Sequence, residues 1–168
     1  RLDDPTRALQ LEPVDFGELL ETLADNARIE ADPRGIRVRL DPVPPLEVEG
    51  DRELLFRALE NVLRNAVRFS PDGGMVALTV LRAADQALLR IRDHGPGVPQ
   101  ESLERIFEPF VSASPARNRE SSGHGIGLAI TARVVALHHG SVSARNAEGG
   151  GLEVEIGLPL RPGSQSES

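Results

Sequence analysis

The stretch Glu60-Asn61-Val62-Leu63-Arg64-Asn65-Ala66-Val67-Arg68-Phe69 decides the fold, because it combines a buried helical face with a second, polar one. Asp51 can cap this helix, and the apolar residues after it recur at the three-to-four spacing of a helix that buries one side. Asn61, Asn65 and Arg68 are spaced i, i+4 and i+7, so the polar face presents two amide oxygens and a guanidinium. Asparagine competes with the helix backbone for hydrogen bonds, so two in mid-helix need a reason. That reason is either a solvated face or a ligand site.

The composition excludes several classes of function. The 168 residues suffice for one domain with a core, and the net charge of 19 − 26 = −7 provides no global basic field for nucleic acid or an anionic membrane. The chain has no cysteine for disulfides or thiolate metal sites, and no apolar run of about 18 residues. All 19 basic residues are arginine. The lack of lysine excludes a Walker A loop, Schiff-base chemistry and the kinase fold that pairs a strand lysine with phosphates.

Helical and strand patterns extend on both sides of this helix. Upstream, we expect a short strand at 11–14, a helix from Asp15 to about 32–35, a strand at 36–40 and a second strand at 46–50 that pairs back on it. Downstream, we expect strands at 75–82 and 87–93, a short helix at about 101–106, a mobile loop at 111–122, a helix at 128–139 and a hairpin of 142–146 with 152–158. These patterns predict an α+β two-layer sandwich, with a mixed, mostly antiparallel sheet of about five strands covered on one face by three main helices.

Two glycine motifs follow the helix. Asp93 ends a predicted strand and is followed by Gly95 and Gly97, which would let backbone approach a flat ligand while the carboxylate accepts a hydrogen bond from an exocyclic amine. An ordinary tight turn would have the same pattern. Gly123-His124-Gly125-Ile126-Gly127 opens a helix, whose free N–H groups suit phosphate. Its third glycine comes one residue too early for a Rossmann fingerprint, and a loop precedes it instead of a strand.

In this order, and with Phe107-Glu108-Pro109-Phe110 between the last two, these motifs resemble those of the ATP-binding catalytic domain of bacterial two-component sensor histidine kinases. Residues 60–69 look like the N box of that family, 93–97 like its G1 box, 107–110 like its F box and 123–127 like its G2 box. The resemblance covers about residues 11–160 and implies the Bergerat (GHKL) fold shared with gyrase, Hsp90 and MutL. The variant it resembles most is the envelope-stress group, which pairs with OmpR-type regulators.

The resemblance also implies the ligands, ATP and Mg²⁺, and the roles of individual residues. Asn61 and Asn65 would hold Mg²⁺ through their side-chain oxygens, with Asn61 also counted as catalytic. Asp93 would accept from the adenine amine and so favour ATP over GTP. Arg117 or Arg119 would neutralise the γ-phosphate when the lid closes, which makes both catalytic. The other implied nucleotide contacts are Arg68, Phe69, Gly95, Gly97, Phe110, Gly123, His124, Gly125, Ile126, Gly127 and Leu128.

Three of these residues depart from the family pattern. Arg68 stands where most relatives have lysine, and a guanidinium can replace it as a bidentate phosphate ligand. Phe69 stands where tyrosine is common, so the apolar face remains and the hydroxyl is lost. His124 replaces a frequent threonine, and we assign it no role.

The resemblance also indicates which nucleophile takes the phosphoryl group. ATP-hydrolysing relatives carry a glutamate four residues before the metal asparagine, and here that position is Asn61, so attack by water should be slow. The expected acceptor is therefore a histidine. None of the four histidines precedes an acidic residue as the acceptor of the family does, so it is expected outside this chain. The alternatives are an ATP-hydrolysing clamp protein of the same fold, or a degenerate module that binds nucleotide only to regulate contacts.

Partners and boundaries follow from the same resemblance. The implied partners are the protein's own dimerisation and phosphoacceptor helical domain and a response-regulator receiver domain, with no nucleic acid and with membrane contact only through missing segments. We expect residues 1–10 to be the end of the dimerisation segment or a linker, 11–160 the catalytic domain and 161–168 a disordered tail. The chain has no initiator methionine and looks like a cut from a longer one. We expect a cytoplasmic domain of an inner-membrane protein, monomeric as this fragment and homodimeric at full length.

Overall fold

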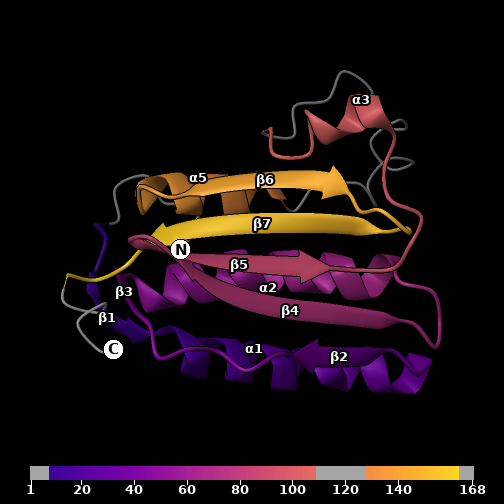
Figure 1. The fold of residues 1–168 in the computed structure, drawn as a ribbon, viewed down its shortest axis with the longest axis horizontal. Helices are drawn as coiled ribbons and strands as arrows, with labels where there is room; N and C mark the ends of the chain where they lie inside the picture. Colours follow the sequence, from indigo (N-terminus) through magenta and orange to yellow (C-terminus); the bar gives the residue numbers. More distant parts are fainter. Residues whose placement is uncertain (1–7, 109–127, 163–168) are drawn as a thin grey trace.

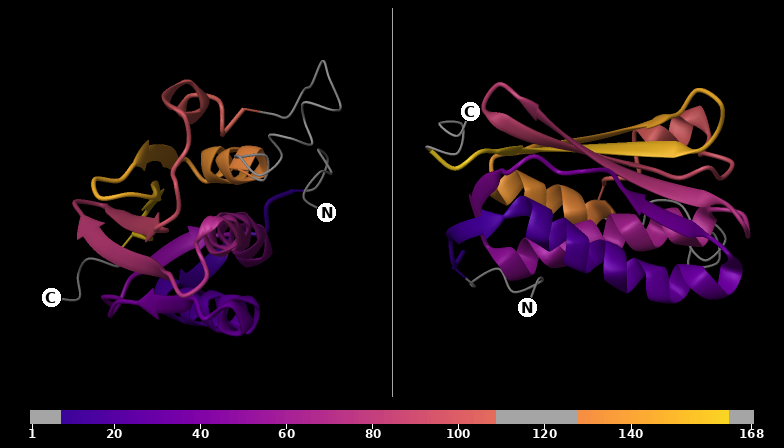
Figure 2. Two further views of the ribbon diagram at one scale, coloured as in Figure 1. Left: turned by 90° about the vertical axis from the view of Figure 1, so that its right-hand side faces the viewer. Right: turned by 60° about the horizontal axis from the view of Figure 1, so that its bottom comes forward.

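Three helices pack against one face of a five-stranded sheet in the computed structural model, which describes residues 8–108 and 128–162 (Figures 1 and 2). The strand order is β2-β4-β5-β7-β6, with β2 parallel to β4 and the other neighbours antiparallel. The predicted two-layer sandwich is confirmed. In chain order the elements are β1 (Glu12–Asp15), α1 (Phe16–Ala31), a 3-10 turn η1 (Asp32–Arg34), β2 (Arg37–Leu40), β3 (Glu47–Gly50), α2 (Arg52–Phe69), β4 (Met75–Ala83), β5 (Gln86–Arg92), α3 (Gln100–Leu103), α5 (Leu128–Leu137), β6 (Ser141–Asn146) and β7 (Leu152–Pro159).

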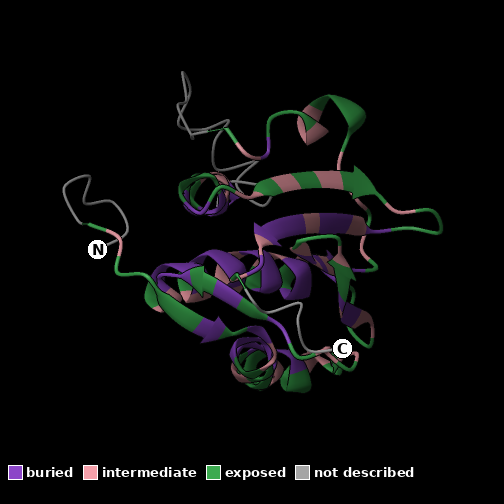
Figure 3. Ribbon diagram, turned by 60° about the vertical axis from the view of Figure 1, so that its left-hand side comes forward, coloured by how far each residue is buried: buried purple, intermediate pink, exposed green. Residues whose placement is uncertain are grey.

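The core lies between the helices and the inner face of the sheet. Val76, Leu78 and Val80 alternate along β4 and are buried, as the period of two requires for a half-covered strand. The leucines of α2 are buried against them, and Figure 3 shows this burial on the helix faces that turn toward the strands. Helix α2 lies between α1 and α5 and packs against both (Figure 2).

The predicted pairing of residues 46–50 with residues 36–40 is wrong. Strand β3 pairs antiparallel with β1, with Glu12 opposite Gly50, and forms a separate two-stranded sheet. Strand β2 instead joins β4 in parallel, with Val38 opposite Val76. The connection between β2 and β3 contains Pro42, Pro44 and Pro45, which have no N–H to donate and a fixed φ, so it does not close a tight hairpin.

The ends of the described chain are tied to the fold. The backbone N–H of Gln10 donates to Oδ2 of Asp51 at 3.0 Å, and that of Arg161 donates to the carbonyl of Glu47 at 2.8 Å. The domain boundaries and the disordered tail remain predictions, because residues 1–7 and 163–168 lie outside the described part, as does the loop at 111–122. None of the described helices combines the length and the apolar character that crossing a membrane requires.

A single guanidinium closes the C-terminal end of α2. Arg34 donates from Nη1 to the carbonyls of Val67 (2.9 Å) and Arg68 (3.4 Å), and from Nη2 to the carbonyl of Ser70 (2.5 Å). Its Nε donates to the carboxylate of Asp72 at 2.8 Å. Helix ends leave their last carbonyls without partners inside the helix and favour positive charge, so Arg34 satisfies both needs at once.

Replacing Arg34 with alanine should therefore lower the free energy of unfolding by about 2 kcal/mol, because charge-assisted bonds to helix-end carbonyls are lost together. Urea unfolding of the two proteins measures the difference. Arg57→Ala is the matched control, because Arg57 forms an exposed i, i+4 pair with Glu53, and its loss should cost less than about 0.5 kcal/mol. Equal losses for the two variants would contradict a special role for Arg34.

Candidate functional site

The first turn of α2 is fixed by contacts with the end of α5. Oδ1 of Asp51 accepts from the N–H of Leu54 at 3.2 Å, which confirms the predicted cap. The N–H of Asp51 donates to Nε2 of buried His138 at 3.0 Å, while Nδ1 of that ring lies 2.8 Å from the carbonyl of Val134. The imidazole thus accepts at Nε2 and donates at Nδ1, as a neutral ring does. This contact holds the helix that presents both asparagines.

The two asparagines of α2 are half-buried and their amides are available to a ligand. Asn61 and Asn65 lie one turn apart, and neither side chain forms a hydrogen bond within the described part of the chain. Amide oxygens are suitable ligands for Mg²⁺, which otherwise keeps water and phosphate around it. No group of three or more histidine or acidic side chains in residues 8–108 and 128–162 could hold a metal. The residues present fit a magnesium ion that takes its other ligands from phosphates and water.

A narrow pocket opens between α2 and the end of β5. Five residues predicted for the site line it: Asn65, Phe69, Asp93, Gly97 and Leu128. Most of the remaining wall is apolar, as a flat aromatic base requires. The rest of the lining is Val62, Ala66, Ile91, Pro96, Val98, Ile106, Leu152 and Val154.

Asp93 is the buried acidic group of this pocket, with only 4% of its surface exposed. Its Oδ1 accepts from the N–H of Gly95 at 2.9 Å and from the N–H of Leu152 at 3.1 Å. Burial raises the pKa of this carboxyl, and the two N–H donors and the nearby charges of His94 and Arg92 oppose that rise. Because Oδ1 already holds both donors, Oδ2 is the oxygen available to accept from a ligand amine.

The two glycines after Asp93 are needed by the protein's own packing. A Cβ on Gly95 would overlap the backbone oxygen of Phe69, and a Cβ on Gly97 would lie 2.5 Å from Oδ1 of Asn146. Gly97 also has a φ of +78°, which favours glycine. Sequence reasoning predicted room for a ligand here, and the structure adds that the motif also lets the loop contact the last residue of α2 and the end of β6.

The last turn of α2 presents the remaining predicted contacts. Phe69 lines the pocket, and the guanidinium carbon of exposed Arg68 lies 5.5 Å from the centroid of its ring, within reach of a cation–π contact. Arg68 does not line the pocket, so its role toward a phosphate stays a prediction. Leu128 begins α5 and is buried. The other predicted residues lie outside the described part, and their roles stay predictions: Phe110, Arg117, Arg119, Gly123, His124, Gly125, Ile126 and Gly127.

Sequence reasoning did not assign the eight apolar wall residues to the site, and it missed one polar contact. Val98 and Ile106 line the pocket from either end of the segment after the glycines, and Leu152 lines it from the first position of β7. The position of Val98, directly after the motif of Asp93, was a signal that could have found it. Asn146 bonds to Val98 from β6, and no local pattern marks it.

A second hollow lies on the helical side of the molecule. This groove encloses about 970 Å³. Asn61 lines it, together with Glu60 and the partly exposed Ile130. Asn61 lines the groove and Asn65 lines the pocket, so two asparagines one turn apart on α2 belong to different hollows. The rest of the groove lining is Gln10, Glu12, Thr22, Asp51, Arg52, Glu53, Phe56 and Arg57.

The sandwich, the asparagine helix and the aspartate at the strand end together define a class of ATP-binding domain. Residues 50–162 match the family described as "Histidine kinase-, DNA gyrase B-, and HSP90-like ATPase", and the chain belongs to this family. Within the family it is the ATP-binding catalytic domain of the histidine kinase type, as the following relatives show.

The signal transduction histidine-protein kinase BaeS of Escherichia coli (strain K12) is 32% identical over 165 residues, covering 98% of this chain and 35% of BaeS. The mycobacterial sensor histidine kinase MprB matches with a TM-score of 0.77 and 34% identity, covering 91% of this chain and 99% of that one. Full-length ShkA in complex with AMPPNP matches with a TM-score of 0.80 and 31% identity, covering 98% of this chain and 34% of ShkA. The chain spans about a third of the length of the curated relatives it matches.

Proposed function

We propose that this domain binds Mg²⁺-ATP in the pocket between α2 and Asp93 and transfers the γ-phosphoryl group to a histidine of a dimerisation domain, for relay to a response-regulator aspartate. The observation that carries the proposal is that a buried carboxylate, that of Asp93, and the side-chain amide of Asn65 line one apolar pocket. The full-length ShkA structure was solved with AMPPNP, an ATP analogue, which supports the choice of nucleotide.

Each residue has a distinct task in this proposal. Oδ2 of Asp93 accepts from the adenine amine, while Phe69 and the apolar wall enclose the base. Asn61 and Asn65 hold Mg²⁺, which supplies charge neutralisation between the phosphates. Arg68 contacts a phosphate from the last turn of α2. The residues outside the described part complete the phosphate site, with Arg117 or Arg119 at the γ-phosphate.

The groove beside Asn61 is the proposed seat of the phosphoacceptor helix. Its lining includes apolar side chains, Ile130 and Phe56, and charged ones, among them Arg52, Arg57 and Glu60. An amphipathic helix laid in such a groove would bring its histidine next to Asn61, one helical turn from Asn65 in the pocket. The absence of a glutamate at position 61 favours this transfer over hydrolysis by water. In the full protein we propose a homodimer anchored in the inner membrane, with this domain on the cytoplasmic side.

The first test is calorimetric titration of the domain with AMPPNP, with and without Mg²⁺. We expect Mg²⁺-dependent binding, and we expect Asn65→Ala to abolish the dependence because the metal loses one of its two protein ligands. Asn26→Ala is the control, since Asn26 is exposed on α1, outside the pocket and the groove. A domain that binds no AMPPNP, or a mutant that keeps full Mg²⁺ dependence, would refute the site.

The second test separates kinase from hydrolase. The domain is mixed with radiolabelled ATP and the dimerisation domain encoded beside it, and phosphohistidine and free phosphate are both measured. We expect phosphohistidine with slow release of free phosphate. Rapid hydrolysis without an acceptor would favour the clamp-protein alternative, and binding without transfer would favour a regulatory module.

A further inference from the structure

The turn between β6 and β7 lies against the end of β5, next to Asp93. The N–H of Asp93 donates to the carbonyl of Leu152 at 3.0 Å, and the N–H of Leu152 returns a bond to Oδ1 of Asp93 at 3.1 Å. Gly151 has a φ of +93°, and a Cβ there would overlap the backbone oxygen of Asp93. The turn is thus in direct contact with the residue proposed to bind adenine.

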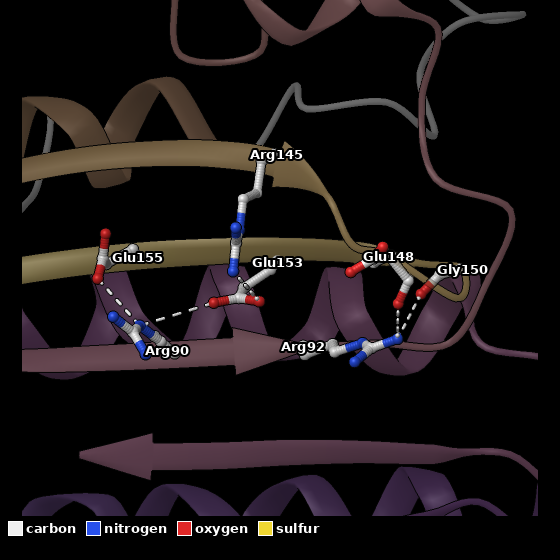
Figure 4. Close-up of polar contacts among 7 residues, drawn as sticks. All are labelled: Arg90, Arg92, Arg145, Glu148, Gly150, Glu153 and Glu155. Carbon is white, nitrogen blue, oxygen red and sulfur yellow. Dashed lines mark hydrogen bonds and ion pairs between the residues drawn. The ribbon is translucent and has the colours of Figure 1, made fainter. Parts of the chain in front are cut away.

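Arg92 holds this turn from the adjacent strand. Its Nη2 donates to the carbonyls of Glu148 and Gly150, both at 3.0 Å, as Figure 4 shows. Its Nε is buried and has no hydrogen-bond partner among the described residues. A buried N–H without a partner costs free energy. The position of the guanidinium therefore satisfies the carbonyls of the turn and leaves its own Nε–H unpaired. The other two arginines in the same view, Arg90 and Arg145, pair with acidic side chains of β7.

Asn146, the last residue of β6, holds the backbone of a second segment that lines the pocket. Its Oδ1 accepts from the N–H of Val98 at 2.9 Å, and its Nδ2 donates to the carbonyl of Val98 at 2.8 Å. Val98 lines the pocket, and Gly97 before it has no space for a side chain because of Asn146. The exposed side chain of Asn146 therefore fixes both the backbone N–H and the carbonyl of Val98.

We propose that Asn146 is a positioning residue for purine binding, which sets the backbone of Gly97 and Val98 at the base-binding end of the pocket. This inference rests on the proposed function, since it assumes that a base occupies the pocket. Asn146 does not contact the nucleotide in this proposal. Asn146 positions the loop of Gly97 and Val98. The turn held by Arg92 positions Asp93 in a similar way.

The test compares Asn146→Ala and Asn146→Asp with the unchanged domain, using calorimetry with Mg²⁺-AMPPNP. We expect about a tenfold rise in Kd for Asn146→Ala, because two hydrogen bonds to the loop are lost. We expect a larger rise for Asn146→Asp at neutral pH, because a carboxylate oxygen would replace the Nδ2 donor and face the carbonyl of Val98. Arg145→Ala is the control from the neighbouring position of β6, on the other face of the strand, and should change Kd less than twofold.

Mg²⁺-tripolyphosphate serves as a probe without a base. Asn146→Ala should leave its affinity unchanged, whereas a general loss of structure would weaken both ligands together. Equal weakening of both, or an AMPPNP affinity equal to that of the unchanged domain, would overturn the proposal. If the unchanged domain binds no AMPPNP, the proposed function itself fails, and this result is distinct from the other two.

Discussion

Replacing Asp93 with asparagine is expected to raise the Kd for AMPPNP about 100-fold and to erase the preference for ATP over GTP. Oδ1 of Asp93 is engaged by the N–H groups of Gly95 and Leu152, so the asparagine must keep its oxygen at that position. Its NH₂ group then takes the place of Oδ2 and faces the ligand. The amide NH₂ of asparagine would then face the amine of adenine, which is also a donor. The oxygen at the same position of guanine would instead accept from the amide NH₂.

Although Asp93→Asn should lose affinity for the nucleotide, its folded state should not lose stability. Burial raises the pKa of Asp93, so the folded state binds a proton more readily than the unfolded chain, and the ionised carboxylate costs stability above that raised pKa. Asp93→Asn removes this cost while keeping both backbone bonds. We expect the variant to be at least as stable as the parent at pH 7, with the advantage disappearing as the pH falls to the range of an ordinary aspartate.

Calorimetry with AMPPNP and the corresponding GTP analogue measures the change in affinity, and urea unfolding from pH 7 down to the range of an ordinary aspartate measures the change in stability. Nucleotide affinity of the parent should also fall as the pH drops through the raised pKa, because a protonated oxygen no longer accepts. A variant that loses stability at pH 7 as strongly as it loses affinity would show that the carboxylate is a structural group.

Gly95→Ala is expected to damage both the fold and the site. The added methyl would overlap the backbone oxygen of Phe69, and backbone cannot move aside as a flexible side chain can. We expect the free energy of unfolding to fall by about 3 kcal/mol and nucleotide binding to become undetectable, because the clash displaces the last turn of α2 away from Asp93. Thermal unfolding and AMPPNP titration measure the two losses.

Gly17→Ala is the matched control for that substitution. Gly17 lies in the first turn of α1, where a Cβ would have its nearest neighbours at an ordinary 3.6 Å. Alanine suits a helix better than glycine, so this variant should keep full binding and gain up to about 1 kcal/mol. Normal binding by Gly95→Ala would show that the contact with Phe69 can relax.

The part of this architecture that local patterns specify was predicted well. Helix α2, its cap at Asp51 and the alternation along β5 are each determined by residues close in sequence. One pocket brings together Asn65, Phe69 and Asp93, and their roles toward a nucleotide stay predictions. The pairing of β3 with β1 was not predictable in this way, because a complete helix, a 3-10 turn and strand β2 separate the two strands in the chain. The contact of Asn146 with Val98 spans 48 positions and depends on a single side chain, so no periodicity announces it.

The carboxylate of Asp51 has a mechanical consequence beyond capping. One of its oxygens receives the N–H of Gln10, through which the chain enters the domain, and the other receives the N–H of Leu54 in the first turn of α2. The entering chain and the asparagine helix are therefore fastened to the same residue. A twist or pull on the incoming segment would act on the helix that carries Asn61 and Asn65 before it reached any strand of the main sheet. Force would thus be transmitted to the helix of Asn61 and Asn65 over the length of one side chain.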